Sequence, residues 1–335
     1  MPFFKKWYLS SDALIKTGAT DKYNMRMNTI SRNSIFIGLG LVINMILAAQ
    51  SVPSNPLSIL VYHPMVLNPA FAGSKDFTNI SFTSKIYNNL GSQIINMHKR
   101  LTSSSGYFSN IGVGAYIFQE QMDQSWNTGV AAAGSYHFAI DEDNVHNIAV
   151  GASLKGFLNK PKSNGEASED TVSSKFNPNM DFGVYYYGPS AFAGLSITSL
   201  FGTKITNEVT IESDAYIQRE YHLHGGYKFL LSINNAIVLE PSLLVSLNDS
   251  TFSEIPKHLV PFLKVYMQNF YVGTYLKNLD IIALFFQYQF PRFYTGVFLE
   301  FPRVGFLNND NIIFEFSLGI NLGQSGQKFL QYRHW

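Results

Sequence analysis

The sequence predicts an all-β fold, a transmembrane antiparallel up-and-down β-barrel of about fourteen strands. Charged residues make up only 14% of the 335 residues, whereas aromatic residues reach 15% and the mean hydropathy is +0.02. A soluble domain carries roughly 25% charged residues. Apolar and polar residues alternate along much of the chain, and after residue 50 no apolar stretch approaches the ~18 residues of a helical span. A soluble β-sandwich or barrel would share the alternation but should carry more surface charge.

The charge balance and the absence of cysteine exclude several functions. The chain has 24 basic and 23 acidic side chains, so no charge argument favours a nucleic-acid partner. Without cysteine there is no disulfide, no thiolate catalysis, no cysteine-ligated zinc and no cysteine that carries a lipid anchor.

An export signal is predicted near the N-terminus. Arg26 and Arg32 form a basic region, residues 35–47 form an apolar region, and small residues then favour cleavage between Ala49 and Gln50. An exported membrane β-barrel is expected in the outer membrane of a Gram-negative cell.

Residues 1–24 fit poorly in front of such a signal, so we expect a start codon assigned too early, with Met25 or Met27 as the true one. A transmembrane helix is the rival interpretation, but the apolar run is short and contains Asn44. The expected organisation is a signal peptide with its upstream extension (1–49), a periplasmic or lumen-entering segment (50–76) and the barrel (77–335).

The alternation is clearest from residue 311, in NIIFEFSLGINL, where apolar even-numbered residues face Glu315, Ser317 and Asn321 on the other side. Similar patterns occur at 148–155, 221–229 and 237–248. One apolar face and one polar face per strand is typical of a membrane barrel with lipid outside and a polar lumen inside.

Strand counting also predicts which connections share an end of the barrel. The long polar segments 160–178, 202–218, 249–257 and 302–310 follow the fifth, seventh, ninth and thirteenth predicted strands. All are odd-numbered connections, so they should lie on one end, which is extracellular if the N-terminus is periplasmic. We expect the outward segments 160–178 and 202–218 to contact a partner, because long polar loops on a rigid scaffold often carry binding function.

A set of polar residues falls on the predicted inner faces. Its members are Lys155, His222, His224, Lys228, Glu240, Lys264, Arg292, Glu300 and Glu315. Mutual pairing inside the lumen explains the mixed charges, and the rival is a selective pore lining. His222 and His224 share a face but lack a third predicted ligand, so no metal is expected.

Aromatic residues and glycines also receive structural interpretations. Tyr185–Tyr187 and Phe285–Phe286 are expected in the aromatic girdles at the membrane interfaces. Gly112, Gly114, Gly225 and Gly226 are expected to relieve crowding in curved strands. We find no catalytic constellation and expect neither enzymatic activity nor a cofactor.

One block resembles a known family. Pro64 is followed by apolar residues and then by Asn68, Pro69, Ala70, Phe71, Ala72 and Gly73, the motif NPAFAG. Together with later phrases such as IGVGAYIFQEQM from Ile111, FNPNMDFGVYYYG from Phe176 and HLHGGYKFLLS from His222, it resembles the PorP/SprF family of outer-membrane proteins associated with type IX secretion. The family usually has Tyr where this chain has Phe71, often has Lys where it has Glu240, and tends to stop near the position of Leu322.

The resemblance implies a non-enzymatic barrel that assists the export or surface attachment of a secreted adhesin or another type IX substrate. Periplasmic ring or motor components of the system are further implied partners, and outer-membrane lipid surrounds the barrel. A passive or hydrophobic-solute transporter is the alternative, because some such barrels also begin with an Asn-Pro-Ala-like segment that plugs the lumen.

The motif has a physical interpretation of its own. Asn68 can cap a turn through its side chain, Pro69 restricts φ, and Gly73 tolerates a positive φ. The motif would fold Phe71 and the apolar residues before Asn68 back towards the barrel mouth. We therefore expect a docking element and not a catalytic loop.

Overall fold

The computed structural model describes residues 56–323, apart from residues 76, 88–89, 103–107, 123–124, 143–144, 162–174, 206–214, 235, 250, 252–257, 278–280, 291 and 303–311. The expected signal peptide, its upstream extension, the cleavage site and the C-terminal residues 324–335 lie outside the described residues. Within the described part, no helix is long and apolar enough to cross a membrane.

In the part of the chain that the structure describes, three short helices precede the strands: α2 (Pro56–Tyr62), α3 (Pro64–Leu67) and the 3₁₀ helix η1 (Pro69–Phe71). The first strands are β1 (Thr78–Tyr87), β2 (Leu90–Thr102), β3 (Phe108–Met122), β4 (Ser125–Ala139), β5 (Asn147–Pro161), β6 (Lys175–Tyr187), β7 (Ala191–Thr198), β8 (Thr203–Ile205) and β9 (Ala215–Ile217). The remaining strands are β10 (Glu220–Tyr227), β11 (Phe229–Ser232), β12 (Ile237–Asn248), β13 (Leu259–Met267), β14 (Phe270–Lys277), β15 (Ile281–Gln289), β16 (Phe293–Pro302) and β17 (Ile313–Leu322).

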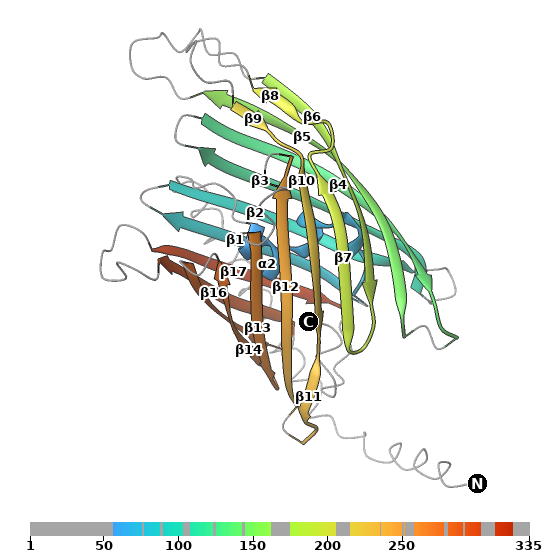
Figure 1. Ribbon diagram of the computed structural model, residues 1–335. Coiled ribbons are helices and arrows are strands. Elements are labelled where there is room, and N and C mark those ends of the chain that lie inside the picture. Colours follow the sequence, from blue (N-terminus) through green and yellow to red (C-terminus); the bar gives the residue numbers. More distant parts are fainter. Residues whose placement is uncertain are drawn as a thin grey trace, which may run out of the picture. The chain divides into compact units, whose positions relative to one another are not determined.

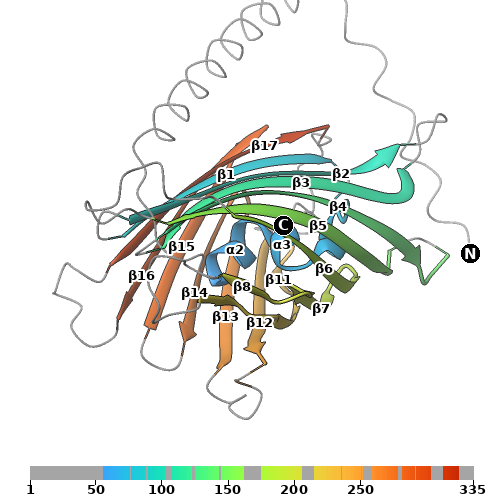
Figure 2. The same ribbon diagram turned by 90° about the horizontal axis from the view of Figure 1, so that it is seen from above.

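The strands close into a ring (Figures 1 and 2). Strands β1–β7 pair antiparallel in chain order, β7 pairs with β10, and β12–β17 again pair in chain order. The pairing of β1 with β17 closes the ring. Both β10 and β11 pair with β12, so they form one barrel strand interrupted at Lys228, whose backbone N–H instead donates to the carbonyl of Ser190 at 2.6 Å. The barrel therefore has fourteen antiparallel strands, as the sequence predicts, while β8 and β9 form a separate hairpin.

The connections divide the barrel into two ends. The long connections 162–174, 199–219, 249–258 and 303–312 follow the fifth, seventh, ninth and thirteenth barrel strands. Successive strands run in opposite directions, so these connections lie at one end, which we call the long-loop end. The other end, where strand pairs such as β6–β7 and β13–β14 are joined by a few residues, is the short-loop end.

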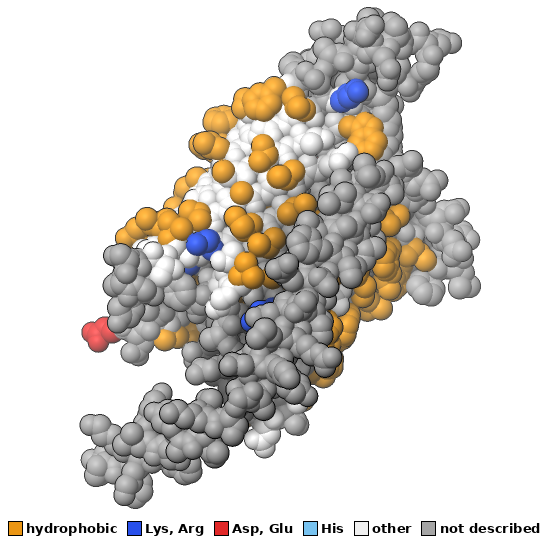
Figure 3. All heavy atoms as spheres, turned by 180° about the vertical axis from the view of Figure 1, so that it is seen from behind, with side chains coloured by type: hydrophobic (Ala, Val, Ile, Leu, Met, Phe, Trp, Pro, Cys, Tyr) orange, Lys and Arg blue, Asp and Glu red, His pale blue; other side chains and the backbone are white. Residues whose placement is uncertain are grey.

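The pleat of each strand separates an apolar outer face from a polar inner face. Large hydrophobic side chains such as Ile117, Leu154, Leu223 and Leu284 are exposed on the outside. Figure 3 shows such side chains spread over one outer face, with few charged groups among them. An exposed apolar surface of this kind suits contact with lipid.

The pleat also corrects the expected aromatic girdle. Tyr185 and Tyr187 point inward and line a lumen cavity, and Phe285 is 3% exposed within the inner core. Consecutive residues of a strand point to opposite faces, so Tyr185–Tyr187 cannot all face lipid.

The two sides of the lumen are filled differently. Along β12–β16 the inner face carries packed apolar and aromatic residues, including Phe262, Tyr271, Tyr275, Phe285 and Phe298. On the other side η1 lies against β4, β5 and β6, and Figure 2 shows the short helices inside the ring.

Candidate functional site

The N-terminal segment, residues 56–73, is the centre of the candidate site. The Asn68 side chain accepts a hydrogen bond from the Ala70 backbone N–H at 3.0 Å and so begins η1, with Pro69 as the first residue of that helix. Gly73 has a φ of +70°, a conformation that favours glycine. The motif is thus a compact turn that reverses the chain before β1.

The turn is hydrogen-bonded to the barrel wall. Asn68 donates through Nδ2 to the carbonyl of Val184 at 3.0 Å, and Ser196 Oγ donates to the carbonyl of Leu67 at 2.6 Å. On the neighbouring wall, Ser135 Oγ lies 2.6 Å and His137 Nε2 2.8 Å from the carbonyl oxygen of Ala72. Backbone groups that a buried turn would leave without partners are therefore satisfied by strand side chains.

Contacts at His63 attach the helices to the start of the barrel. Its Nε2 lies 2.6 Å from Thr83 Oγ1, and Asn96 Nδ2 donates to its Nδ1 at 2.7 Å. Because Nδ1 accepts, the proton of the neutral ring resides on Nε2 and is donated to Thr83. Burial lowers the pKa of His63 to about 3, so the ring is neutral at physiological pH.

Strand glycines provide space for the segment. A Cβ at Gly151 would lie 2.5 Å from the Ala70 nitrogen, and one at Gly112 would overlap the Ala72 carbonyl. A Cβ at Gly114 would meet Met65, and one at Gly183 would meet Asn68. The space beside Gly112 and Gly114 is therefore filled by Ala72 of the motif and by Met65 of α3, which the sequence did not predict.

The other side of the segment reaches the opposite wall. The hydroxyl of Tyr62 donates to the carbonyl of Val297 on β16 at 2.9 Å. Leu60 and Leu67 pack into the aromatic cluster of β12–β16. The segment therefore bridges the lumen from the glycine-rich strands to the aromatic strands.

Two cavities lie along the segment. One, of about 440 Å³, is lined by residues from the long-loop half of the strands, such as Lys85, Glu120 and Phe157. The other, of about 140 Å³, is lined by residues near the short-loop end, such as Lys75, Gly188 and Gln289. We call the first the long-loop cavity and the second the short-loop cavity. Because Leu67 lines both, the N-terminal segment lies between them.

The predicted lumen residues form separate groups. Lys155 pairs with Asp181 at 2.6 Å, and Glu315 lies 3.6 Å from Lys85. The carboxylate of Glu300 accepts a hydrogen bond from the Tyr275 hydroxyl.

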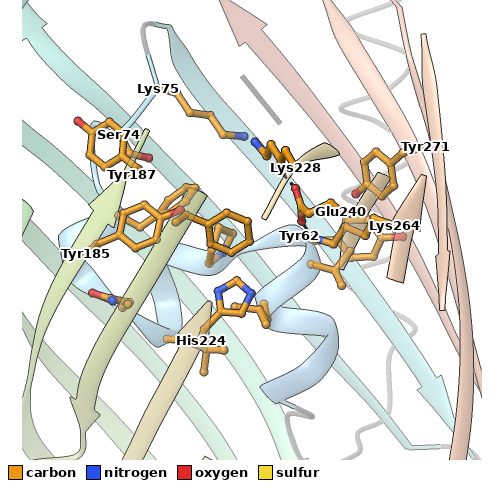
Figure 4. A pocket seen from close by; sticks show the side chains of 18 of the residues that line it. Tyr62, Ser74, Lys75, Tyr185, Tyr187, His224, Lys228, Glu240, Lys264 and Tyr271 are labelled. Carbon is orange, nitrogen blue, oxygen red and sulfur yellow. Dashed lines mark ion pairs between the residues drawn. The ribbon is translucent and has the colours of Figure 1, made fainter. Parts of the chain in front are cut away.

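Glu240 lies between two cations. Its distances to Lys264 and Lys228 are 3.2 and 3.8 Å, and Tyr266 donates to it at 2.9 Å. Figure 4 shows Glu240 with Lys228 and Lys264 beside the short-loop cavity.

The remaining predicted residues are placed differently. Arg292 was expected in the lumen but is exposed in the turn between β15 and β16. The strand before it ends at Gln289, so the alternation does not extend to Arg292.

His222 is buried and hydrogen-bonds Thr198 and Ser246, and His224 lies two residues further along β10. Among the described residues, no cluster of three or more His, Asp or Glu side chains could hold a metal ion.

Several partners of the predicted lumen residues were not predicted from the sequence, although a signal was present. Lys85 and Asp181 occupy inward positions of alternating strands and could have been found by extending the pattern to 78–87 and 177–187. Nothing in the sequence indicates that Ser135 and His137 meet the motif, because those contacts join distant segments. The same is true of the contacts of His63 with Thr83 and Asn96.

A closed ring of fourteen antiparallel strands with an apolar exterior and a polar, occupied lumen defines an outer-membrane β-barrel. The chain belongs to the PorP/SprF family: residues 49–320 match the family described as type IX secretion system membrane protein PorP/SprF. This is a family of membrane barrels and not of enzymes.

Solved barrels are similar at low identity. A KdgM porin is 8% identical, with 72% of this chain and 98% of that chain covered and a TM-score of 0.34. The CymD monoaromatic hydrocarbon channel is 11% identical, with 78% and 91% covered and a TM-score of 0.43. Omp33 of Acinetobacter baumannii is 10% identical, with 75% and 100% covered and a TM-score of 0.29. No curated protein matches the chain.

Proposed function

We propose that this protein is a plugged outer-membrane barrel that assists the export or surface attachment of a secreted partner, such as an adhesin or another type IX substrate. The observation that carries the proposal is the N-terminal segment held inside the lumen by hydrogen bonds with β4, β6 and β7. A barrel filled in this way suits a scaffold better than a channel.

The long-loop end is the proposed partner surface. The N-terminal segment precedes β1 at the short-loop end, so a periplasmic N-terminus places the long connections outside the cell. The proposed contact segments 160–178 and 202–218 lie largely outside the described residues. The described parts of segment 202–218 include β8 near its start and β9 near its end.

The test is co-purification from the native cell after mild detergent extraction. We expect the barrel to retain a secreted partner, and a variant lacking residues 206–214 to lose it while keeping the heat-modifiable gel mobility of a folded barrel. Shortening the 303–311 connection serves as the control at the same end. A secreted partner retained equally by all three proteins would contradict the assignment of the 202–218 segment.

The transporter alternative is tested by conductance in planar bilayers. A partner-holding barrel should be electrically silent, whereas a passive channel should conduct. Steady conductance of the purified wild-type protein, without a co-purified partner, would replace the proposal with the transporter function.

A further inference from the structure

The short-loop cavity collects positive charge from three separate parts of the chain. Lys75 follows the NPAFAG motif, Lys228 occupies the break between β10 and β11, and Lys264 lies on β13. Glu240 is the one carboxylate among the described residues that line this cavity. Three ammonium groups thus face one carboxylate, which leaves a formal excess of two positive charges.

Glu240 forms ion pairs with only two of these three lysines. Its two oxygens lie 3.2 Å from Lys264 and 3.8 Å from Lys228. Lys75 lies over the ring of Phe77, 5.5 Å from the ring centroid, and has no ion pair with a carboxylate of the described residues. In Figure 4 the tip of Lys75 points towards that of Lys228.

The surroundings of Lys75 make this arrangement costly without a counter-ion. Burial, together with the charges of Lys228 and Lys264, lowers the pKa of Lys75 to about 8. The group is still mainly protonated at neutral pH. Like charges held together in a partly buried site are stabilised when an anion binds between them.

Two further features indicate what kind of anion would fit. The Nε2 atom of His224, which lines the cavity, has no hydrogen-bond partner among the described residues. Tyr185, Tyr187 and Phe192 add aromatic walls. A cavity of about 150 Å³ holds a molecule the size of benzene, so the 140 Å³ here has room for one carboxylate on a short carbon chain.

We propose that this cavity is an anion-binding site that takes the carboxylate of an acidic peptide presented at the short-loop end of the barrel. Lys75 and Lys228 would bind the carboxylate, His224 would contribute a ring nitrogen, and the aromatic walls would pack on the carbon chain. The proposal does not depend on the proposed function, because binding of a peptide by the purified barrel is measured without export or a surface partner.

The experiment measures the anisotropy of a fluorescein-labelled hexaglutamate peptide with the purified full-length barrel in neutral detergent. Loss of one charged hydrogen bond costs at least about 1.4 kcal/mol, so Lys75→Gln should weaken binding at least about tenfold. Glu240→Gln removes the competing internal carboxylate and should strengthen binding. Lys277→Gln, a partly exposed lysine at the long-loop end of β14 that lines neither cavity, is the matched control and should leave binding unchanged.

Heat-modifiable gel mobility establishes that each variant is folded. Equal weakening by Lys75→Gln and Lys277→Gln would show general surface attraction and overturn the proposal, as would unchanged binding in folded Lys75→Gln. Competition with inorganic phosphate, acetate and unlabelled hexaglutamine distinguishes a phosphate site from a carboxylate site. If phosphate displaces the labelled peptide at concentrations at which acetate and hexaglutamine do not, the cavity is a phosphate site and the carboxylate proposal is overturned.

Discussion

At the scale of single residues, His63 shows how one side chain attaches the N-terminal segment to two strands. Its neutral ring donates to Thr83 on β1 and accepts from Asn96 on β2. Protonation of Nδ1 would remove the acceptor and place a charge in a site that is 1% exposed. Acid should therefore weaken this attachment.

The pH dependence follows from the direction of the shift. The pKa of His63 is about 3 in the folded protein, below the ordinary value of 6.5, so the unfolded chain binds the proton more tightly. The stabilisation is complete above pH 6.5 and is lost as the pH falls towards 3, with a slope of at most about 1.4 kcal/mol per pH unit for one proton.

Urea unfolding in lipid vesicles between pH 4 and 7 measures this prediction. The glutamine side chain of the variant His63→Gln cannot titrate, so the unfolding free energy of the variant should depend less steeply on pH than that of the wild type. The other histidines are present in both proteins, so the difference between the two curves reports on His63. Parallel curves for the two proteins would show that His63 does not carry the effect.

At the scale of elements, the fit between η1 and the strands depends on missing side chains. Gly112→Ala would drive a methyl group into the Ala72 carbonyl and Ser135 Oγ. Overpacking of this kind costs about 1–3 kcal/mol. Gly134→Ala is the matched control on the adjacent strand, because a Cβ there meets nothing within 4 Å.

Limited proteolysis with chymotrypsin measures the fit, because Tyr62 and Phe71 are protected only while the segment is docked. We expect faster cleavage in Gly112→Ala than in Gly134→Ala, with both barrels remaining heat-modifiable. Equal protection in the two variants would mean that the strands shift to accommodate the methyl group and that the close approach is not required.

At the scale of the whole molecule, the N-terminal segment separates the long-loop cavity from the short-loop cavity. Removing residues 50–73 should join the two cavities into a water-filled path, since polar side chains line the emptied half of the lumen. We expect the deletion variant to conduct in planar bilayers, whereas the wild type and a variant lacking residues 206–214 stay silent. A folded but silent deletion variant would show that the aromatic cluster of β12–β16 closes the lumen by itself.

The sequence alone determined the barrel, its count of about fourteen strands and the placement of the four long connections at one shared end. It could do so because side chains alternate with a period of two in every strand, so the inner and outer faces are a local property. The turn chemistry of Asn68, Pro69 and Gly73 was also readable, since capping and a positive φ concern neighbouring residues.

Only the tertiary structure decided what the lumen contains. Gly112 and Gly151 meet the NPAFAG turn, and Lys75 joins Lys228 and Lys264 around one cavity, through contacts between residues far apart in the chain. Tertiary structure also decides the positions of Arg292 and Phe285, which differ from the predicted ones. Arg292 is exposed because β15 ends before it, and Phe285 is buried because its side chain packs with the aromatic residues of the interior. Alternation assigns a residue to a face, but closure of the ring decides which side chains on the inner face touch one another.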